Sequence, residues 1–170
     1  GERVRRITSW LEGYDLSQGM LAKARAKRVY DHLEQADIGF DFHAGGLARA
    51  TTVQLVAAAD VFAYFGDLDG VIGMAADLLQ PGGLLAFSCE AGPDEADWLL
   101  QPSLRYCHGA AYLGGLLERH GFSIEQLRRE AIRRDGETMI EGLLVIARKQ
   151  DIDVEYASPR LDPAVQTGTP

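Results

Sequence analysis

Residues 11–25, LEGYDLSQGMLAKAR, decide the fold of this chain, because they place an acidic residue where a short strand passes into a helix. Gly13 to Leu16 would close the strand, and Ser17 can cap the helix by accepting a hydrogen bond from its first turn. Asp15 would then project from the carboxyl end of the strand, where open α/β sheets bind ligands. Its carboxylate could bind both hydroxyls of a ribose, or it could only cap the helix, and the sequence leaves both interpretations open.

The rest of the chain alternates between helices and strands. Helices are expected where apolar residues recur at helical spacing, over residues 17–28, 69–79 and 110–120. Strands are expected over residues 32–36, 54–59 and 84–88, and the last two are near-continuous apolar runs, as in strands buried on both faces. The order predicts an α/β fold with a parallel sheet and right-handed crossovers.

The end of the chain changes character. Residues 124–134 and 138–148 flank Asp135-Gly136, a dipeptide typical of a tight hairpin turn. The apolar run Leu143 to Ile146 predicts that the second strand of this hairpin inserts centrally in the sheet. We expect one domain over residues 1–149, an appended tail over 150–170, and a loop or short helix over 40–52.

Composition narrows the classes of partner. The 170 residues carry a net charge of −8, which argues against nucleic acid as the main partner and favours a small-molecule substrate. No apolar run is long enough to span a bilayer, so no membrane contact is expected. Cys89 and Cys107 have neither metal-ligand spacing nor the density of a disulfide scaffold, which predicts no metal site and a cytoplasmic location. The sequence leaves open whether the protein forms a homo-oligomer.

Five motifs, taken together, resemble class I S-adenosylmethionine-dependent methyltransferases. DLSQGMLAKAR is similar to the second motif of that family, an acidic residue followed by a hydrophobic one, Ser and a helix with Met-Leu. The other four follow in the family's order, at residues 34–38 (EQADI), 54–67 (QLVAAADVFAYFGD), 79–89 (LQPGGLLAFSC) and 116–122 (LLERHGF). The nearest branch is a group of bacterial proteins, some of them fused to tetratricopeptide repeats.

The resemblance implies a Rossmann-like methyltransferase sheet, mainly parallel, with an antiparallel hairpin at its C-terminal end. A Rossmann dehydrogenase, the least favoured alternative, has no such hairpin. The family's first strand and glycine-rich loop should lie just before Asp15, but the chain opens at Gly1-Glu2-Arg3. We therefore expect the domain to lack its first strand and the backbone that only glycine lets approach a cofactor closely.

The resemblance also assigns a cofactor site for S-adenosylmethionine. Asp15 would hold the ribose, and Asp37 would bind the adenine amino group unless it is only a loop residue. Met20 would pack against the adenine, although a Met on a helix is more often core. The remaining cofactor contacts are expected from Leu16, Ile38 and Ala59.

The acceptor side is expected beyond the strand at residues 54–59 and in a lid at residues 105–108. Asp60 could face the methyl donor or the acceptor, or only cap the next turn. Tyr106, His108 and Tyr112 could contact the acceptor, and His108 could take a proton from it, although a lone His is usually a plain surface residue. Arginines at positions 128, 129, 133 and 134 form either a basic patch or a solvated hairpin face.

The predicted function is methyl transfer from S-adenosylmethionine to a small-molecule acceptor. The alternative is a non-catalytic methyltransferase-like module that acts through a protein partner.

Overall fold

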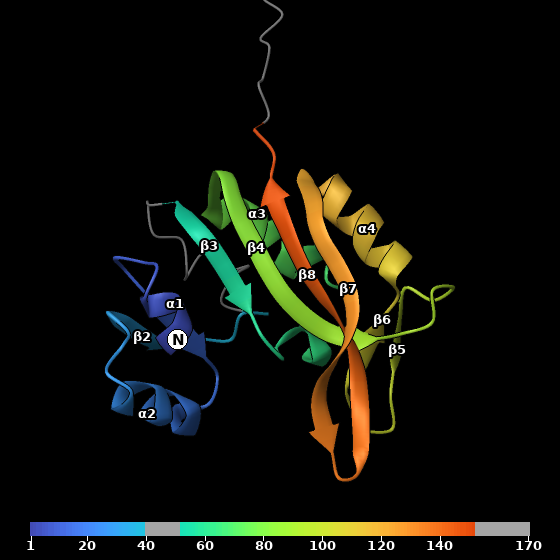
Figure 1. Ribbon diagram of the computed structural model, residues 1–170, viewed down its shortest axis with the longest axis horizontal. Helices are drawn as coiled ribbons and strands as arrows, with labels where there is room; N and C mark the ends of the chain where they lie inside the picture. Colours follow the sequence, from blue (N-terminus) through green and yellow to red (C-terminus); the bar gives the residue numbers. More distant parts are fainter. Residues whose placement is uncertain (40–51, 152–170) are drawn as a thin grey trace, which may run out of the picture.

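Two β-sheets carry the fold of the computed structural model, which describes residues 1–39 and 52–151 (Figure 1). The expected loop at 40–52, except its last residue, and nearly all of the expected tail at 150–170 lie outside the described residues.

The smaller sheet pairs β1 (Glu12–Asp15) with β2 (His32–Gln35) in parallel, as the sequence predicts. The helix α2 (Gln18–Ala26) connects them and begins after Ser17, whose side chain accepts the Met20 N–H at 3.3 Å. This confirms Ser17 as the cap. The helix ends two residues before the predicted end, and Arg28 already has a positive φ of 53°. A short helix that the sequence analysis missed, α1 (Glu2–Arg5), precedes β1.

The larger sheet has the strand order β5-β6-β4-β8-β7, with β3 paired to β4. Its strands are β3 (Val53–Ala58), β4 (Leu79–Ala91), β5 (Trp98–Leu100), β6 (Tyr106–His108), β7 (Phe122–Asp135) and β8 (Thr138–Lys149). The pairs β3–β4 and β4–β6 are parallel, whereas β4–β8, β5–β6 and β7–β8 are antiparallel. The sheet is therefore mixed rather than mainly parallel.

The hairpin of β7 and β8 confirms two predictions. Gly136, in the turn, has a φ of 58°, which only glycine adopts at little cost. The strand β8 lies between β4 and β7, and its residues Leu143, Val145 and Ala147 are at most 1% exposed. The apolar run in β8 thus occupies the interior of the sheet.

Helices cover one face of the larger sheet. Figure 1 shows α3 (Asp69–Leu78) and α4 (Ala110–Arg119) behind β4, β8 and β7. The two helices bury an apolar cluster against the sheet, which includes Ile72, Leu113, Leu116, Leu85 and Leu143. Leu144 and Ile146, between the buried positions of β8, are only half-buried. The core therefore lies on the helix side of the sheet.

Candidate functional site

Three aspartates lie at or just beyond the carboxyl ends of three strands. Asp15 ends β1, Asp37 lies two residues after β2, and Asp60 lies two residues after β3. The loops after β2 and β3 touch, because a Cβ built on Gly39 would lie 2.8 Å from Cε1 of Phe65. The carboxyl ends of the smaller and the larger sheet therefore meet on one side of the molecule, where α/β folds bind ligands.

Asp15 orders the turn that precedes the helix and retains acceptor capacity. Its Oδ1 accepts the Ser17 N–H at 2.8 Å. Within the described residues, its second carboxylate oxygen accepts no hydrogen bond. The helix cap is Ser17 and not Asp15, and a carboxylate oxygen has room for further donors, so the ribose interpretation of Asp15 stays a prediction.

Leu16 and Met20 are open to solvent next to Asp15. Their exposed fractions are 62% and 50%, and Leu21 is instead the buried residue of α2. Met20 is therefore not a core residue, which removes the structural alternative for it. Two apolar side chains beside a carboxylate match the chemistry of a nucleoside, with its flat apolar base and its hydroxyls.

The other predicted cofactor residues differ in their surroundings. Asp37 Oδ1 accepts the Gly39 N–H at 3.0 Å, which shapes the loop after β2. Ile38 packs against the main core, whereas Ala59 is exposed. Ile38 thus anchors the loop that carries Asp37.

Asp60 is held by contacts that the sequence analysis missed. Its φ is 55°, its N–H donates to Ser88 Oγ at 3.0 Å, and its Oδ1 accepts from Arg105 Nη1 at 3.0 Å. Arg105 also donates from Nη2 to the hydroxyl of Tyr64 at 3.2 Å and lies 5.1 Å from the centre of that ring. Arg105 is 45 residues from Asp60 in sequence, so no local pattern signals the contact.

Residues 106–108 form the strand β6, so the expectation that residues 105–108 are a loop is wrong for these three. His108 is fully buried, and its Nε2 lies 3.0 Å from the carbonyl oxygens of both Phe65 and Gly66. Because carbonyl oxygens only accept, Nε2 must carry the proton. Nδ1 is buried and has no hydrogen-bond partner among the described residues. Burial lowers the pKa of His108, although the two carbonyls oppose that shift. The ring is thus a neutral donor that holds the loop before α3.

The two tyrosines near β6 have different roles. Tyr112 donates its hydroxyl proton to Asp67 at 2.9 Å and accepts the Leu68 N–H at 2.9 Å. Burial raises the pKa of Tyr112 to about 12, so it stays protonated. Tyr106 and Trp98 lie against Gly66, where a Cβ would come within 3.0 Å of each ring. Of the two tyrosines, Tyr112 therefore fixes a loop, while Tyr106 adds aromatic surface beside it.

Neither the cysteines nor the arginines form a separate site. Burial raises the pKa of Cys89 to about 12, which makes it an inert thiol, and Cys107 is also buried. Arg129 pairs with Asp94 at 2.8 Å and Arg133 with the buried Glu90 at 2.5 Å. The arginines of the hairpin are therefore largely neutralised by neighbouring carboxylates, which favours the solvated hairpin face over a basic patch.

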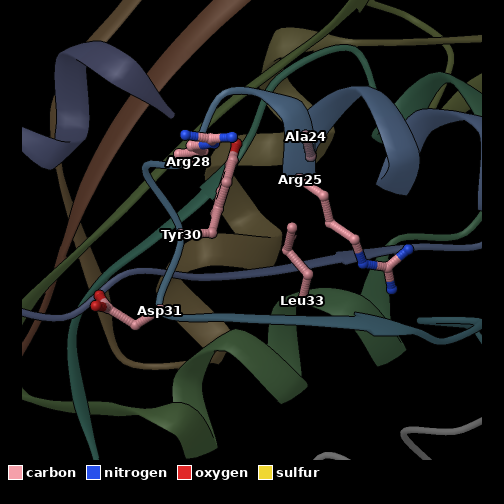
Figure 2. Close-up of a pocket in the computed structure, with 6 residues that line it drawn as sticks. All are labelled: Ala24, Arg25, Arg28, Tyr30, Asp31 and Leu33. Atoms are coloured by element: carbon pink, nitrogen blue, oxygen red, sulfur yellow. The ribbon is translucent and has the colours of Figure 1, made fainter.

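A pocket of about 230 Å³ lies at the opposite end of the smaller sheet (Figure 2). It is lined by Ala24, Arg25, Arg28, Tyr30, Asp31 and Leu33, from the end of α2 and the start of β2. None of Asp15, Asp37 and Asp60 lines this pocket. In the part of the chain that the structure describes, no group of His, Cys, Asp or Glu could hold a metal ion, and no helix has the length and apolarity to cross a membrane.

Neither a family model nor a curated protein matches the sequence. Solved structures do match the fold. A S-adenosylmethionine-dependent methyltransferase from Methanosarcina mazei is 13% identical, with a TM-score of 0.65, over 88% of this chain and 86% of that one. A methyltransferase from Mesorhizobium loti is 22% identical, with a TM-score of 0.60, over 83% and 81% of the two chains. The N-methyltransferase NodS from Bradyrhizobium japonicum, solved with S-adenosylhomocysteine, is 20% identical, with a TM-score of 0.60, over 87% and 72%. The chain therefore has the α/β fold of S-adenosylmethionine-dependent methyltransferases.

Proposed function

We propose that this protein binds S-adenosylmethionine and transfers its methyl group to a small-molecule acceptor. The observation that carries the proposal is that Asp15, Asp37 and Asp60 each lie at or just beyond the carboxyl end of a parallel strand in a methyltransferase fold. NodS, with S-adenosylhomocysteine bound, shares that fold. No comparison supports the alternative of a non-catalytic module.

The cofactor would lie across the carboxyl ends of β1 and β2. The second carboxylate oxygen of Asp15 would accept from the ribose hydroxyls, while the oxygen that accepts the Ser17 N–H keeps the carboxylate oriented. Asp37 would accept from the adenine amino group, and the exposed Met20 and Leu16 would cover the base. Ile38 and Ala59 would supply the remaining contacts to the cofactor. S-adenosylmethionine supplies an activated methyl group, so the protein has mainly to position the two reactants.

The acceptor would lie on the β3 side of the site. Asp60 is exposed there and oriented by Arg105, so it is the group best placed to bind a donor on the acceptor. Tyr106 would supply apolar contact. His108 is buried with its N–H bonded to two carbonyls, so we propose that it positions the loop before α3 instead of acting as a base.

The decisive experiment compares Asp15→Asn with Asp15→Ala in the full-length protein. Asparagine keeps an oxygen for the Ser17 N–H but loses the charge, whereas alanine loses both. Each charge-assisted hydrogen bond to the ribose contributes about 1.5 to 3 kcal/mol, so both variants should bind S-adenosylhomocysteine more weakly in calorimetry. Only the alanine variant should also lose stability, by about 0.5 to 2 kcal/mol. An alanine variant with the parent's affinity contradicts the proposed ribose site.

A further inference from the structure

The hairpin of β5 and β6 lies directly beyond the carboxyl end of β3. The strand β4 pairs with β8 on one edge. On its other edge it pairs first with β3, as far as Phe87, and then with β6, from Glu90. The strand β6 therefore continues along the line on which β3 stops, and β5 pairs with β6. Since open α/β sheets bind ligands at the carboxyl ends of parallel strands, this hairpin borders the place that we assign to the methyl acceptor.

Exposed apolar side chains gather on this hairpin and on the loop after β3. Five of the large hydrophobic residues that are exposed in the described chain lie here: Tyr64, Trp98, Leu99, Leu100 and Leu104. Leu100 is 56% exposed and Leu104 is 78% exposed. Leu104 also has a positive φ, and strained residues of this kind cluster at ligand sites. A cluster of exposed apolar side chains marks a binding surface.

The pairing of β5 with β6 places the rings of this hairpin on one face. Trp98 pairs with His108 and Leu100 with Tyr106, so these four side chains point to the same side. That side packs against the loop after β3, because a Cβ on Gly66 would come within 3.0 Å of the rings of both Trp98 and Tyr106. Leu100 and Tyr106 therefore continue an apolar surface from this loop toward the turn of the hairpin.

One polar group interrupts the apolar surface. Asp60 and Arg105 form an ion pair at 3.0 Å, and Arg105 lies against the ring of Tyr64. The two charges compensate each other, so neither is left to balance a charged ligand. The Asp60 side chain is half exposed, and within the described residues its second carboxylate oxygen accepts no hydrogen bond. Asp60 can therefore accept a hydrogen bond from a hydroxyl or amino group of a bound molecule.

We propose that the methyl acceptor is an uncharged, largely apolar small molecule with one hydroxyl or amino group. That group donates to Asp60, while the apolar body lies on Tyr64, Leu100 and Leu104. The inference rests on the proposed function, because it names the acceptor of the same site. A second copy of the chain is the competing occupant, but five side chains fall well short of the about 20 to 30 residues that each partner contributes to a stable interface.

The test titrates the protein with phenol and with 4-butylphenol, which share one hydroxyl and differ in their apolar body. Binding is followed by NMR at the indole N–H of Trp98, which the Trp10→Phe variant distinguishes from that of Trp10. Each methylene that becomes buried tightens binding up to about fourfold, so 4-butylphenol should bind at least about tenfold more tightly than phenol. The charged 4-butylbenzoate should bind at least about tenfold more weakly than 4-butylphenol.

Three variants locate the binding surface. Leu100→Ser and Leu104→Ser change exposed side chains and should each reduce the advantage of the butyl chain several-fold. Ile124→Ser, at an exposed position of β7 on the opposite side of the sheet, is the matched control and should leave both affinities unchanged. Asp60→Gly removes the carboxylate, and glycine tolerates the positive φ at this position. It should weaken the binding of both phenols by the same factor.

Equal affinities for phenol and 4-butylphenol would overturn the proposal, and so would tighter binding of 4-butylbenzoate. A dimer that Leu104→Ser dissociates would assign the surface to a second copy instead. Titration of the same samples with S-adenosylhomocysteine separates the two proposals. Binding of 4-butylphenol without binding of S-adenosylhomocysteine would contradict only the proposed methyl transfer. Binding of S-adenosylhomocysteine without any gain from the butyl chain would contradict only the class of acceptor.

Discussion

At the scale of one residue, Leu104 has a strained backbone conformation in the loop before β6. This leucine has a φ of 59°, in the left-handed region, and its side chain is 78% exposed. The left-handed conformation costs a residue with a Cβ about 1 to 2 kcal/mol, and the side chain gains little from packing in return. The strained turn directly precedes Arg105, which contacts Asp60.

Leu104→Gly should therefore stabilise the fold. The relief of strain exceeds the extra backbone entropy of glycine, which leaves a gain of about 0.5 to 1 kcal/mol in the free energy of unfolding. Leu104→Ala keeps the Cβ and is the matched control, with little expected change. Denaturant unfolding of the three proteins measures the difference. A glycine variant that is less stable than the alanine variant would show that the strain at position 104 is smaller than the extra backbone entropy of glycine.

His108 predicts a pH dependence. Its pKa is lowered from 6.5 in the folded protein by burial, so the folded state binds fewer protons than the unfolded state near and below that value. Its contribution to stability is therefore present above pH 6.5 and is lost as the pH falls below 6.5 toward the folded pKa. NMR of the imidazole should show a neutral ring with the proton on Nε2 at pH 6.5 and somewhat below. A ring that titrates at or above its ordinary value would contradict this geometry.

Sequence reasoning located the aspartates but could not find their partners. Asp15, Asp37 and Asp60 lie at or just after the ends of short predicted strands, so the local pattern alone places them at carboxyl ends. The contact from Arg105 to Asp60 depends on how β6 lies beside β4, and the burial of His108 depends on the loop before α3. Such long-range contacts cannot be recognised from the spacing of residues in the sequence.

At the scale of elements, two glycines show that helix propensity and packing have different effects on a substitution of glycine by alanine. In α4, a Cβ on Gly115 would meet nothing within 4 Å. In β8, a Cβ on Gly142 would lie 2.5 Å from Ile132 and 2.7 Å from the carbonyl oxygen of Cys89. The same substitution should therefore have opposite effects in the two elements.

Gly115→Ala should stabilise the protein by about 0.5 to 1 kcal/mol, because alanine is the better helix former. Gly142→Ala should cost about 1 to 3 kcal/mol, since neighbouring backbone must move to accept the methyl group. Thermal unfolding of both variants beside the parent provides the measurement. Equal effects at the two positions would mean that β8 adjusts freely between β4 and β7.

The predicted elements that were found are the long or strongly patterned ones. The cap at Ser17, the helix α4 and the β7–β8 hairpin each carry several signals at once. The missed elements are short: α1 has four residues, and β5 and β6 have three each. Such segments have too few positions for a period to show, and their structure comes from β4, which extends to Ala91 and pairs with β6.

For the whole molecule, the described strands form two separate sheets, and the sequence could not show which strand edges lack a partner among the described strands. The outer edge of β7 is well protected, because its strand has two irregularities and carries the charged pair Arg128 and Glu130. The edge of β3 has neither a charge nor a proline between Val53 and Ala58.

An unguarded apolar edge of this kind is a template for other chains. The 170-residue chain should therefore self-associate into β-rich aggregates as its concentration rises, which light scattering and thioflavin fluorescence would record. Ala57→Lys, at an exposed position of β3, should delay that aggregation, and Ser123→Lys, at an exposed position of β7, should not. A chain that stays monodisperse at high concentration would contradict this expectation. The exposure of the β3 edge thus bears on the solubility of the protein as well as on its fold.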